Sequence, residues 1–200
     1  MKPRLAVIGA GWLGGTVGKA WVKTGYEVMF SSRHPEELQA LIDGLGENAS
    51  VGTLSEAAQF GSILLFAVPG SSLAEVARDL RGAIEGKVVL DATNTSDADN
   101  ASASQKSLSG ARLVRAFSAV DATEIEASST RTSRKLAVPI ASDDREAMEV
   151  AATLVRAAGC EPVIIGGLGS AKVFQRKAPG FRAHLSEPEL RKLLGVKKDS

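Results

Sequence analysis

A glycine-rich run near the amino terminus has the residue spacing that most clearly points to chemistry: Gly9-Ala10-Gly11-Trp12-Leu13-Gly14. It follows a short apolar segment typical of a buried strand and precedes a segment with helical periodicity, which is the context this motif requires. There Gly9 permits a tight turn, Gly11 leaves room for a phosphate beside the backbone, and Gly14 lets the helix pack close to the strand. The free N–H groups at the helix start then bind the diphosphate of a dinucleotide.

The second strand, predicted at residues 27–30, should end at the residues that select the nucleotide. An NAD-binding protein usually has an acidic residue there, against the ribose 2′-hydroxyl. This chain continues instead with Ser31, Ser32 and Arg33. Glu27 stands at the wrong end of the strand, about 13 Å from Ser31 at roughly 3.3 Å per residue. Two hydroxyls and a guanidinium suit a 2′-phosphate, so the sequence favours NADP over NAD.

Three further strand ends are predicted to reach the same ligand, because in open α/β sheets the ligand lies beyond the carboxyl ends of the strands. The first continues as Ala67-Val68-Pro69, whose backbone is expected to pack along the cofactor. The second leads to Thr93 and Asn94, which are expected at the nicotinamide or its ribose, although ordinary turn chemistry explains them equally well. The third ends at Phe117, either a wall of the acceptor pocket or a core residue.

Alternating strand and helix patterns predict the elements that position these residues. The strand-type segments are 4–8, 27–30, a weak one around 51, 62–68, 87–90, 113–117, 134–141 and 162–165. The helical segments are 12–24, 35–45, 55–60, 72–81, 143–158 and 187–194. This alternation predicts an α/β fold with a Rossmann-type parallel sheet and helices on both faces. Residues 94–110, rich in Ser, Ala, Asn and Asp, are predicted to be a long functional loop.

The domain organisation expected from this pattern is an NADP-binding Rossmann domain at residues 1–170 and a short carboxyl-terminal helical extension at 171–200. Only about 35 residues follow Ile165, too few for the helical second domain of a pyrroline-5-carboxylate reductase or a β-hydroxyacid dehydrogenase. A second substrate is therefore expected at the edge of the same fold or in a neighbouring subunit.

The composition excludes several classes of partner. With 24 basic and 23 acidic residues the formal net charge is +1, which gives no reason to expect nucleic acid or an acidic membrane surface. The one cysteine, Cys160, is expected to be structural rather than nucleophilic. No secretory leader and no membrane span are recognisable, so a cytoplasmic location is expected.

The inventory of reactive side chains is short. The sequence contains no metal-type His/Cys cluster, no nucleophile elbow and no Tyr-x-x-x-Lys pair. We therefore predict no catalytic residue and no metal ligand. An acceptor that needs little help from protein acids, such as a flavin-like ring, fits this absence best. A non-catalytic NADP-binding redox sensor fits it equally well.

Taken together, these motifs resemble those of the NADPH-dependent coenzyme F420 reductases (F420:NADP oxidoreductases) and their bacterial relatives. The resemblance is carried by the run from Gly9 to Gly15, Ser31-Ser32-Arg33, Ala67-Val68-Pro69, Asp91-Ala92-Thr93-Asn94 and Gly166-Gly167-Leu168-Gly169. It covers about the first 170 residues. Ferric-reductase domains and the amino-terminal domains of pyrroline-5-carboxylate reductases share these motifs, so a ferric-reductase-like domain is a further alternative.

The resemblance implies that NADPH lies along Gly11 to Leu13, with Ser31 and Arg33 at its 2′-phosphate. It implies a small-molecule electron acceptor in a cleft near Asn94 and Phe117, and direct hydride transfer to the deazaflavin F420. A homodimer is a further expectation. The segment 174–195 is short and charged, whereas the F420 enzymes are expected to have a longer apolar helical end. A flavin or a ferric chelate is therefore an alternative acceptor.

Overall fold

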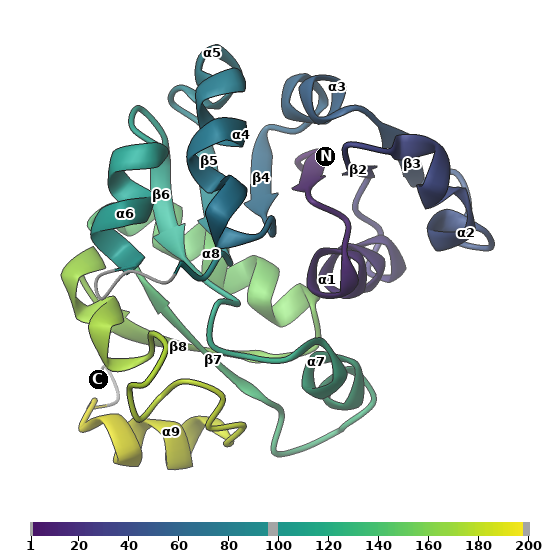
Figure 1. Ribbon diagram of the computed structural model, residues 1–200. Coiled ribbons are helices and arrows are strands. Elements are labelled where there is room, and N and C mark those ends of the chain that lie inside the picture. Colours follow the sequence, from purple (N-terminus) through teal and green to yellow (C-terminus); the bar gives the residue numbers. More distant parts are fainter. Residues whose placement is uncertain (1, 96–99, 198–200) are drawn as a thin grey trace.

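A computed structural model describes residues 2–95 and 100–197, and this described part is built around one eight-stranded sheet (Figure 1). The strands lie in the order β3-β2-β1-β4-β5-β6-β7-β8. Their bounds are β1 (Leu5–Ile8), β2 (Val28–Ser31), β3 (Ala49–Gly52), β4 (Ile63–Phe66), β5 (Val88–Asp91), β6 (Arg112–Arg115), β7 (Ala137–Ala141) and β8 (Glu161–Gly166). The order changes direction between β1 and β4, the position at which doubly wound sheets bind their ligands.

Helices cover both faces of the sheet, so the predicted Rossmann-type fold is confirmed. Leu5 and Val7 of β1 pack on one side with Trp21, and the next residues, Ala6 and Ile8, belong to the core of the other side. The first side is covered by α1 (Trp12–Lys23), α7 (Ala122–Ser129) and α8 (Arg145–Ala157). The second side is covered by α3 (Leu54–Phe60), α4 (Leu73–Asp79), α5 (Arg81–Ile84), α6 (Asn100–Ser107) and the 3₁₀ helix η3 (Leu168–Val173). Apolar runs such as β4, which is buried throughout, are typical of strands covered on both faces.

The far edge of the sheet differs from a fully parallel arrangement. Strands β1 to β6 are parallel, but β7 pairs with β6 in the antiparallel direction through Arg115 and Ala141 alone. After β6 the chain runs past α1 by way of α7 and does not cross back over the sheet. It therefore enters β7 from beyond the carboxyl end of β6. Helix α8 then makes a regular crossover to β8, which is parallel to β7.

Two helices were not predicted from the sequence. Residues 100–107 of the predicted long loop form α6, and residues 96–99 of that loop lie outside the described part of the chain. Helix α7 follows β6 where no helix was expected. Both helices bury mainly small residues, so their apolar periodicity is faint. The buried positions of α7 are Ala122, Ile125 and Ser128, and only one of them has a large apolar side chain.

Two predicted helices are shorter or broken. The segment predicted at 35–45 forms the 3₁₀ helix η1 (Pro35–Leu38) and a single turn, α2 (Gln39–Ile42). Gly44 and Gly46, both in left-handed conformations, follow that turn. The segment predicted at 72–81 begins with the 3₁₀ helix η2 (Gly70–Ser72), and its helix is interrupted at Leu80, between α4 and α5.

The carboxyl-terminal extension ends in the predicted short helix, α9 (Glu187–Leu194). Its Leu190 is buried against Ala137 of β7 and Val163 of β8, which attaches the extension to the sheet. The 3₁₀ helix η3 spans the domain boundary expected at residue 170. Within residues 2–95 and 100–197, no helix has the length and apolar character needed to cross a membrane.

Candidate functional site

The turn from β1 into α1 has the geometry that the glycine spacing predicts. Gly9 adopts a φ of +97°, and a Cβ on it would lie 2.9 Å from the carbonyl oxygen of Ala67. A Cβ on Gly14 would lie 2.3 Å from the carbonyl oxygen of Gly9. Gly11 differs from both, because a Cβ there would meet no atom within 4 Å. The first and third glycines are therefore needed for packing, whereas the space beside Gly11 is open to a ligand.

The first turn of α1 is free to bind an anion. Gly11 is its N-cap, no side chain caps it, and the first turn contains no acidic residue. The N–H groups of a helix start have no partner within the helix and carry the positive end of its dipole. Trp12 is 71% exposed, and Leu13 beside it is half-buried. These features fit the diphosphate of a dinucleotide.

The end of β2 places the three predicted nucleotide-selecting residues in different environments. Ser31 is fully buried, and its hydroxyl donates to the carbonyl oxygen of Val7 at 2.7 Å. The hydroxyl of Ser32 accepts from the backbone N–H of His34 at 2.8 Å. Arg33 is exposed and has no ion-pair partner among the described residues. The Arg33 guanidinium is therefore available to an anionic ligand, while the hydroxyl hydrogen of Ser31 is already used inside the protein.

The chain leaving β4 packs against the glycine turn. The backbone N–H of Ala67 donates to the carbonyl oxygen of Ile8 at 2.9 Å, and both Ala67 and Val68 touch Gly9. Pro69 is exposed and leads into η2. Ala67 and Val68 thus form a wall beside the candidate nucleotide site, as expected for backbone that packs along a cofactor.

The turn that follows β5 contains Thr93 and Asn94 and lies over a buried ion pair between Asp91 and Arg115. Asp91 accepts from the N–H of Thr93 at 2.9 Å, and Arg115 donates to the Thr93 carbonyl oxygen at 2.9 Å. The Asn94 side chain donates through Nδ2 to the Ser118 carbonyl oxygen at 2.7 Å. Neither Asp91 nor Arg115 was expected in this role from the sequence. A charged residue between Val114 and Ala116, inside an apolar strand, was the available signal.

Three buried oxygen atoms around this turn, Thr93 Oγ1, Asn94 Oδ1 and Ser118 Oγ, lack a hydrogen-bond partner among the described residues, as does Arg115 Nε beneath it. Leaving such atoms unsatisfied costs about 1–3 kcal/mol each, so each is a natural contact for a bound polar molecule. An amide oxygen and two hydroxyls suit a carboxamide and a ribose. The residues present therefore fit the nicotinamide end of a dinucleotide.

A cleft of about 460 Å³ opens between the start of α1 and the carboxyl-terminal segment. Its walls include Trp12 and Leu13, the polar residues Asn94 and Ser118, and Phe117. Phe117 is fully buried, with a φ of +61°, and it makes an edge-to-face contact with Trp21 at 6.3 Å between ring centres. It therefore belongs to the core and also borders the cleft.

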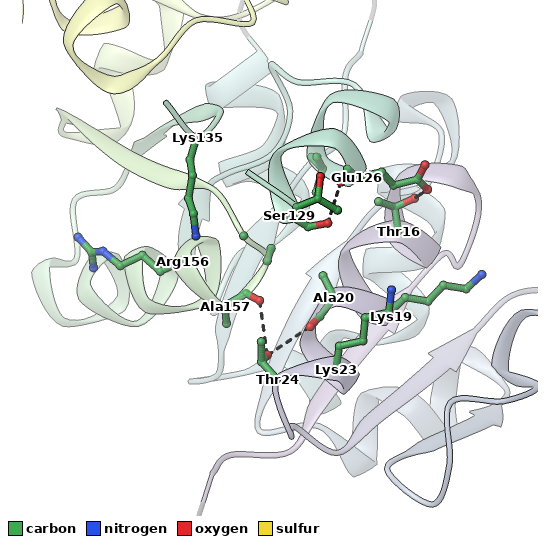
Figure 2. A pocket seen from close by; sticks show the side chains of 14 residues that line it. Thr16, Lys19, Ala20, Lys23, Thr24, Glu126, Ser129, Lys135, Arg156 and Ala157 are labelled. Carbon is green, nitrogen blue, oxygen red and sulfur yellow. Dashed lines mark hydrogen bonds between the residues drawn. The ribbon is translucent and has the colours of Figure 1, made fainter. Parts of the chain in front are cut away.

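A larger cleft of about 640 Å³ lies on another side of the molecule, between α1, α7 and α8 (Figure 2). Its basic residues are Lys19, Lys23, Lys135 and Arg156. They surround the carboxyl-terminal ends of three helices, where unpaired carbonyl oxygens and the negative end of the helix dipole attract cations. The helix ends account for the charge of this cleft, and neither the glycine turn nor Thr93 and Asn94 line it, so we do not assign it to the nucleotide.

Cys160 is buried, and its environment matches the structural role expected from the sequence. Burial raises the pKa of its thiol to about 12, against smaller opposing effects of Ser128 and two nearby cations. The protonated thiol is a poor nucleophile at neutral pH. Among the described residues no group of three or more His, Cys, Asp or Glu side chains is placed to hold a metal ion.

The fold and this edge of the sheet define a dinucleotide-binding protein of the Rossmann class. Residues 4–95 match the family described as NADP oxidoreductase, coenzyme F420-dependent. This segment is therefore similar to a family of NADP-dependent oxidoreductases, in line with the resemblance predicted from its motifs.

Three similar proteins extend the comparison beyond residue 95. The chain is 26% identical over 180 residues to the metalloreductase STEAP3 of Rattus norvegicus, covering 85% of this chain but 35% of that protein. It therefore spans about a third of this curated relative. The fold resembles the hypothetical protein SMa0349 of Sinorhizobium meliloti, with a TM-score of 0.80, 22% identity and coverage of 91% of this chain and 94% of the other. It also resembles a protein of Arthrobacter sp. FB24 provisionally described as an F420-dependent NADP-reductase, with a TM-score of 0.72, 19% identity and coverage of 86% and 88%.

Proposed function

We propose that this protein is an NADPH-dependent reductase that passes a hydride to a small organic acceptor with a flavin-like or deazaflavin ring, such as F420. One observation carries the proposal. Trp12 and Leu13, which follow the open turn at Gly11, line the same cleft as Asn94 and Ser118, whose Oδ1 and Oγ atoms are unsatisfied. A nucleotide held at Gly11 and at these two polar side chains would present its nicotinamide to a ring that lies in the cleft against Trp12.

The residues of this chain have separate tasks in that arrangement. The N–H groups at the start of α1 bind the diphosphate, and the backbone of Ala67 and Val68 forms the wall beside it. Arg33 binds the 2′-phosphate by a charge-assisted hydrogen bond. Asn94 Oδ1 accepts a hydrogen bond from the carboxamide, while its Nδ2 stays fixed on Ser118. The buried pair of Asp91 and Arg115 keeps this turn in place.

The chemistry supplied by bound NADPH is the transfer of a hydride, two electrons with one proton, to the acceptor, which takes any further proton from water. The protein's contribution is to hold the two rings at reacting distance and to limit access of water. Among the described residues that line the cleft, Asp121 is the acidic one; it pairs with Arg182 at 2.8 Å and lies 3.2 Å from His184. Asp121 is therefore occupied by Arg182 and is not placed in the reaction.

We also propose a division of labour between the two parts of the chain. Residues 1–170 hold the nucleotide, and the extension at 171–200 contributes one wall of the acceptor cleft through Arg176, Phe181 and Arg182.

The test is acceptor-dependent oxidation of NADPH, followed by absorbance at 340 nm, with F420, FMN and ferric chelates as acceptors. We expect oxidation with at least one ring-type acceptor and a much lower rate with NADH at the same concentration. The matched control is Gly82→Val. A Cβ on Gly82, like one on Gly11, would meet no atom within 4 Å, but Gly82 lies away from the site, so only Gly11→Val should abolish the reaction.

Tight NADPH binding without oxidation by any acceptor would overturn the reductase proposal in favour of a non-catalytic NADP-binding sensor. A ferric reductase is the second candidate, and the similarity to the metalloreductase STEAP3 favours it. Oxidation of NADPH by ferric chelates, without reduction of either ring acceptor, would select that function.

A further inference from the structure

The carboxyl-terminal segment 174–185 is held over the cleft by specific contacts. The backbone N–H of Arg182 donates to the Ala119 carbonyl oxygen at 2.8 Å, and its guanidinium pairs with Asp121 at 2.8 Å. Lys177, Arg182 and His184 adopt left-handed backbone conformations, with φ values of 73°, 53° and 49°. Such conformations persist only where the surrounding contacts enforce them. The backbone path of this segment over the cleft is therefore fixed by these contacts.

This segment brings two arginines to the cleft, and they differ in whether an acidic side chain neutralises them. Arg182 is neutralised by Asp121, and its guanidinium also lies over the Phe181 ring, 5.4 Å from the ring centre. Arg176 also lines the cleft, is exposed, and has no ion-pair partner among the described residues. Among the described residues that line the cleft, one is acidic, Asp121, and two are arginines, an excess of one positive charge.

The opposite wall has a different character. Trp12 is 71% exposed on the first turn of α1, an unusual position for a large aromatic side chain unless something covers it. Phe181 of the extension also lines the cleft, and the buried Phe117 lies behind its surface. The cleft therefore offers aromatic surface on the nucleotide side and an unpaired guanidinium on the side of the extension.

From this juxtaposition we infer that the acceptor is an aromatic ring compound with an anionic substituent, and that Arg176 binds its phosphate or carboxylate. The inference rests on the proposed function and narrows its substrate class. The ring lies against Trp12, and the anion reaches Arg176 on the opposite wall. Selection for an anionic acceptor is thus a property of the extension, not of the nucleotide-binding part.

The test compares FMN with riboflavin, which share one ring system and differ by a phosphate. Binding is measured in the presence of NADP⁺ by quenching of flavin fluorescence, so the readout does not depend on turnover. We expect FMN to bind at least about fivefold more tightly, the effect of roughly 1 kcal/mol from a partly exposed ion pair. Arg176→Gln should abolish the difference between the two flavins. Arg145→Gln, which removes an equal charge from an arginine whose side chain is 91% exposed on α8, should preserve it.

The outcomes separate this inference from the proposed function. Equal affinity for the two flavins, binding of neither, or a preference that survives Arg176→Gln would overturn the anion site. Preferential binding of FMN without NADPH oxidation by any acceptor would overturn the reductase proposal and leave the anion site in place. NADPH oxidation with equal KM for FMN and riboflavin would overturn the anion site and leave the reductase proposal in place.

Discussion

Arg115 at the end of β6 and Asp91 at the end of β5 form an ion pair buried beneath the turn that carries Asn94. Their side chains are 1% and 0% exposed. Arg115 also donates to the hydroxyl of Ser104 at 3.1 Å, which ties α6 to the same pair. Two strand ends, one helix and the candidate nicotinamide contacts therefore depend on one interaction.

Breaking this pair should be strongly destabilising. Arg115→Met leaves Asp91 as a buried, uncompensated carboxylate, and we expect the free energy of unfolding to fall by about 3–5 kcal/mol. Arg78→Met, at the exposed pair of Arg78 and Asp79, should cost less than about 1 kcal/mol. Urea unfolding followed by circular dichroism measures both. Equal losses for the two variants would show that the buried pair has no special structural role.

Arg33 should determine the preference for NADPH. Because Arg33 is exposed and makes no ion pair among the described residues, its removal should leave the fold unchanged. Arg33→Ala should weaken NADPH binding by about 1.5–3 kcal/mol, the range for a hydrogen bond to a charged group, and leave NADH binding almost unchanged. Calorimetric titration with both nucleotides, with Arg145→Ala as a charge-matched control, tests this. Equal losses for NADPH and NADH would contradict the assignment.

The same substitution at two glycines of the turn from β1 into α1 should have different effects, a loss of stability at Gly14 and a loss of NADPH affinity at Gly11. Gly14→Ala places a Cβ 2.3 Å from the Gly9 carbonyl oxygen and should destabilise the fold by about 1–3 kcal/mol or more. Gly11→Ala meets no protein atom within 4 Å and should change stability little, yet weaken NADPH about tenfold, which is 1.4 kcal/mol. Thermal unfolding and nucleotide titration of each variant separate the effects. A Gly11→Ala protein with unchanged NADPH affinity would argue against a diphosphate at this turn.

Cys160 should be chemically silent in the folded protein. Because burial raises its pKa to about 12, a disulfide reagent at pH 8 should react much more slowly with the native protein than with protein unfolded in guanidinium. The same pKa predicts a stability change. The unfolded thiol ionises from about pH 9, whereas the folded thiol does not, so stability should fall as the pH rises from about 9 to 12, and less so in Cys160→Ala. Native labelling as fast as that of the unfolded chain would refute the burial argument.

Much of the site could be predicted because its signals are local. Gly9, Gly11 and Gly14 are spaced within one turn, and the apolar runs of β1, β4 and β5 identify strands without knowledge of their neighbours. Because those strands are parallel, their carboxyl ends lie at the same edge of the sheet. Helix α7 escaped prediction for the opposite reason, because one large apolar residue, Ile125, carries too little periodicity to mark a helix.

The sequence by itself determined the fold class, the position of the nucleotide turn and the replacement of an acidic residue by Arg33, because each depends on neighbouring residues and on backbone geometry. The tertiary structure alone decided that Ser31 is sealed beneath the turn, that β7 runs against β6, and that Arg176 reaches the cleft beside Trp12. Those relationships join residues far apart in the chain. They follow from which surfaces can be buried together, a property of the packed molecule and not of any local pattern.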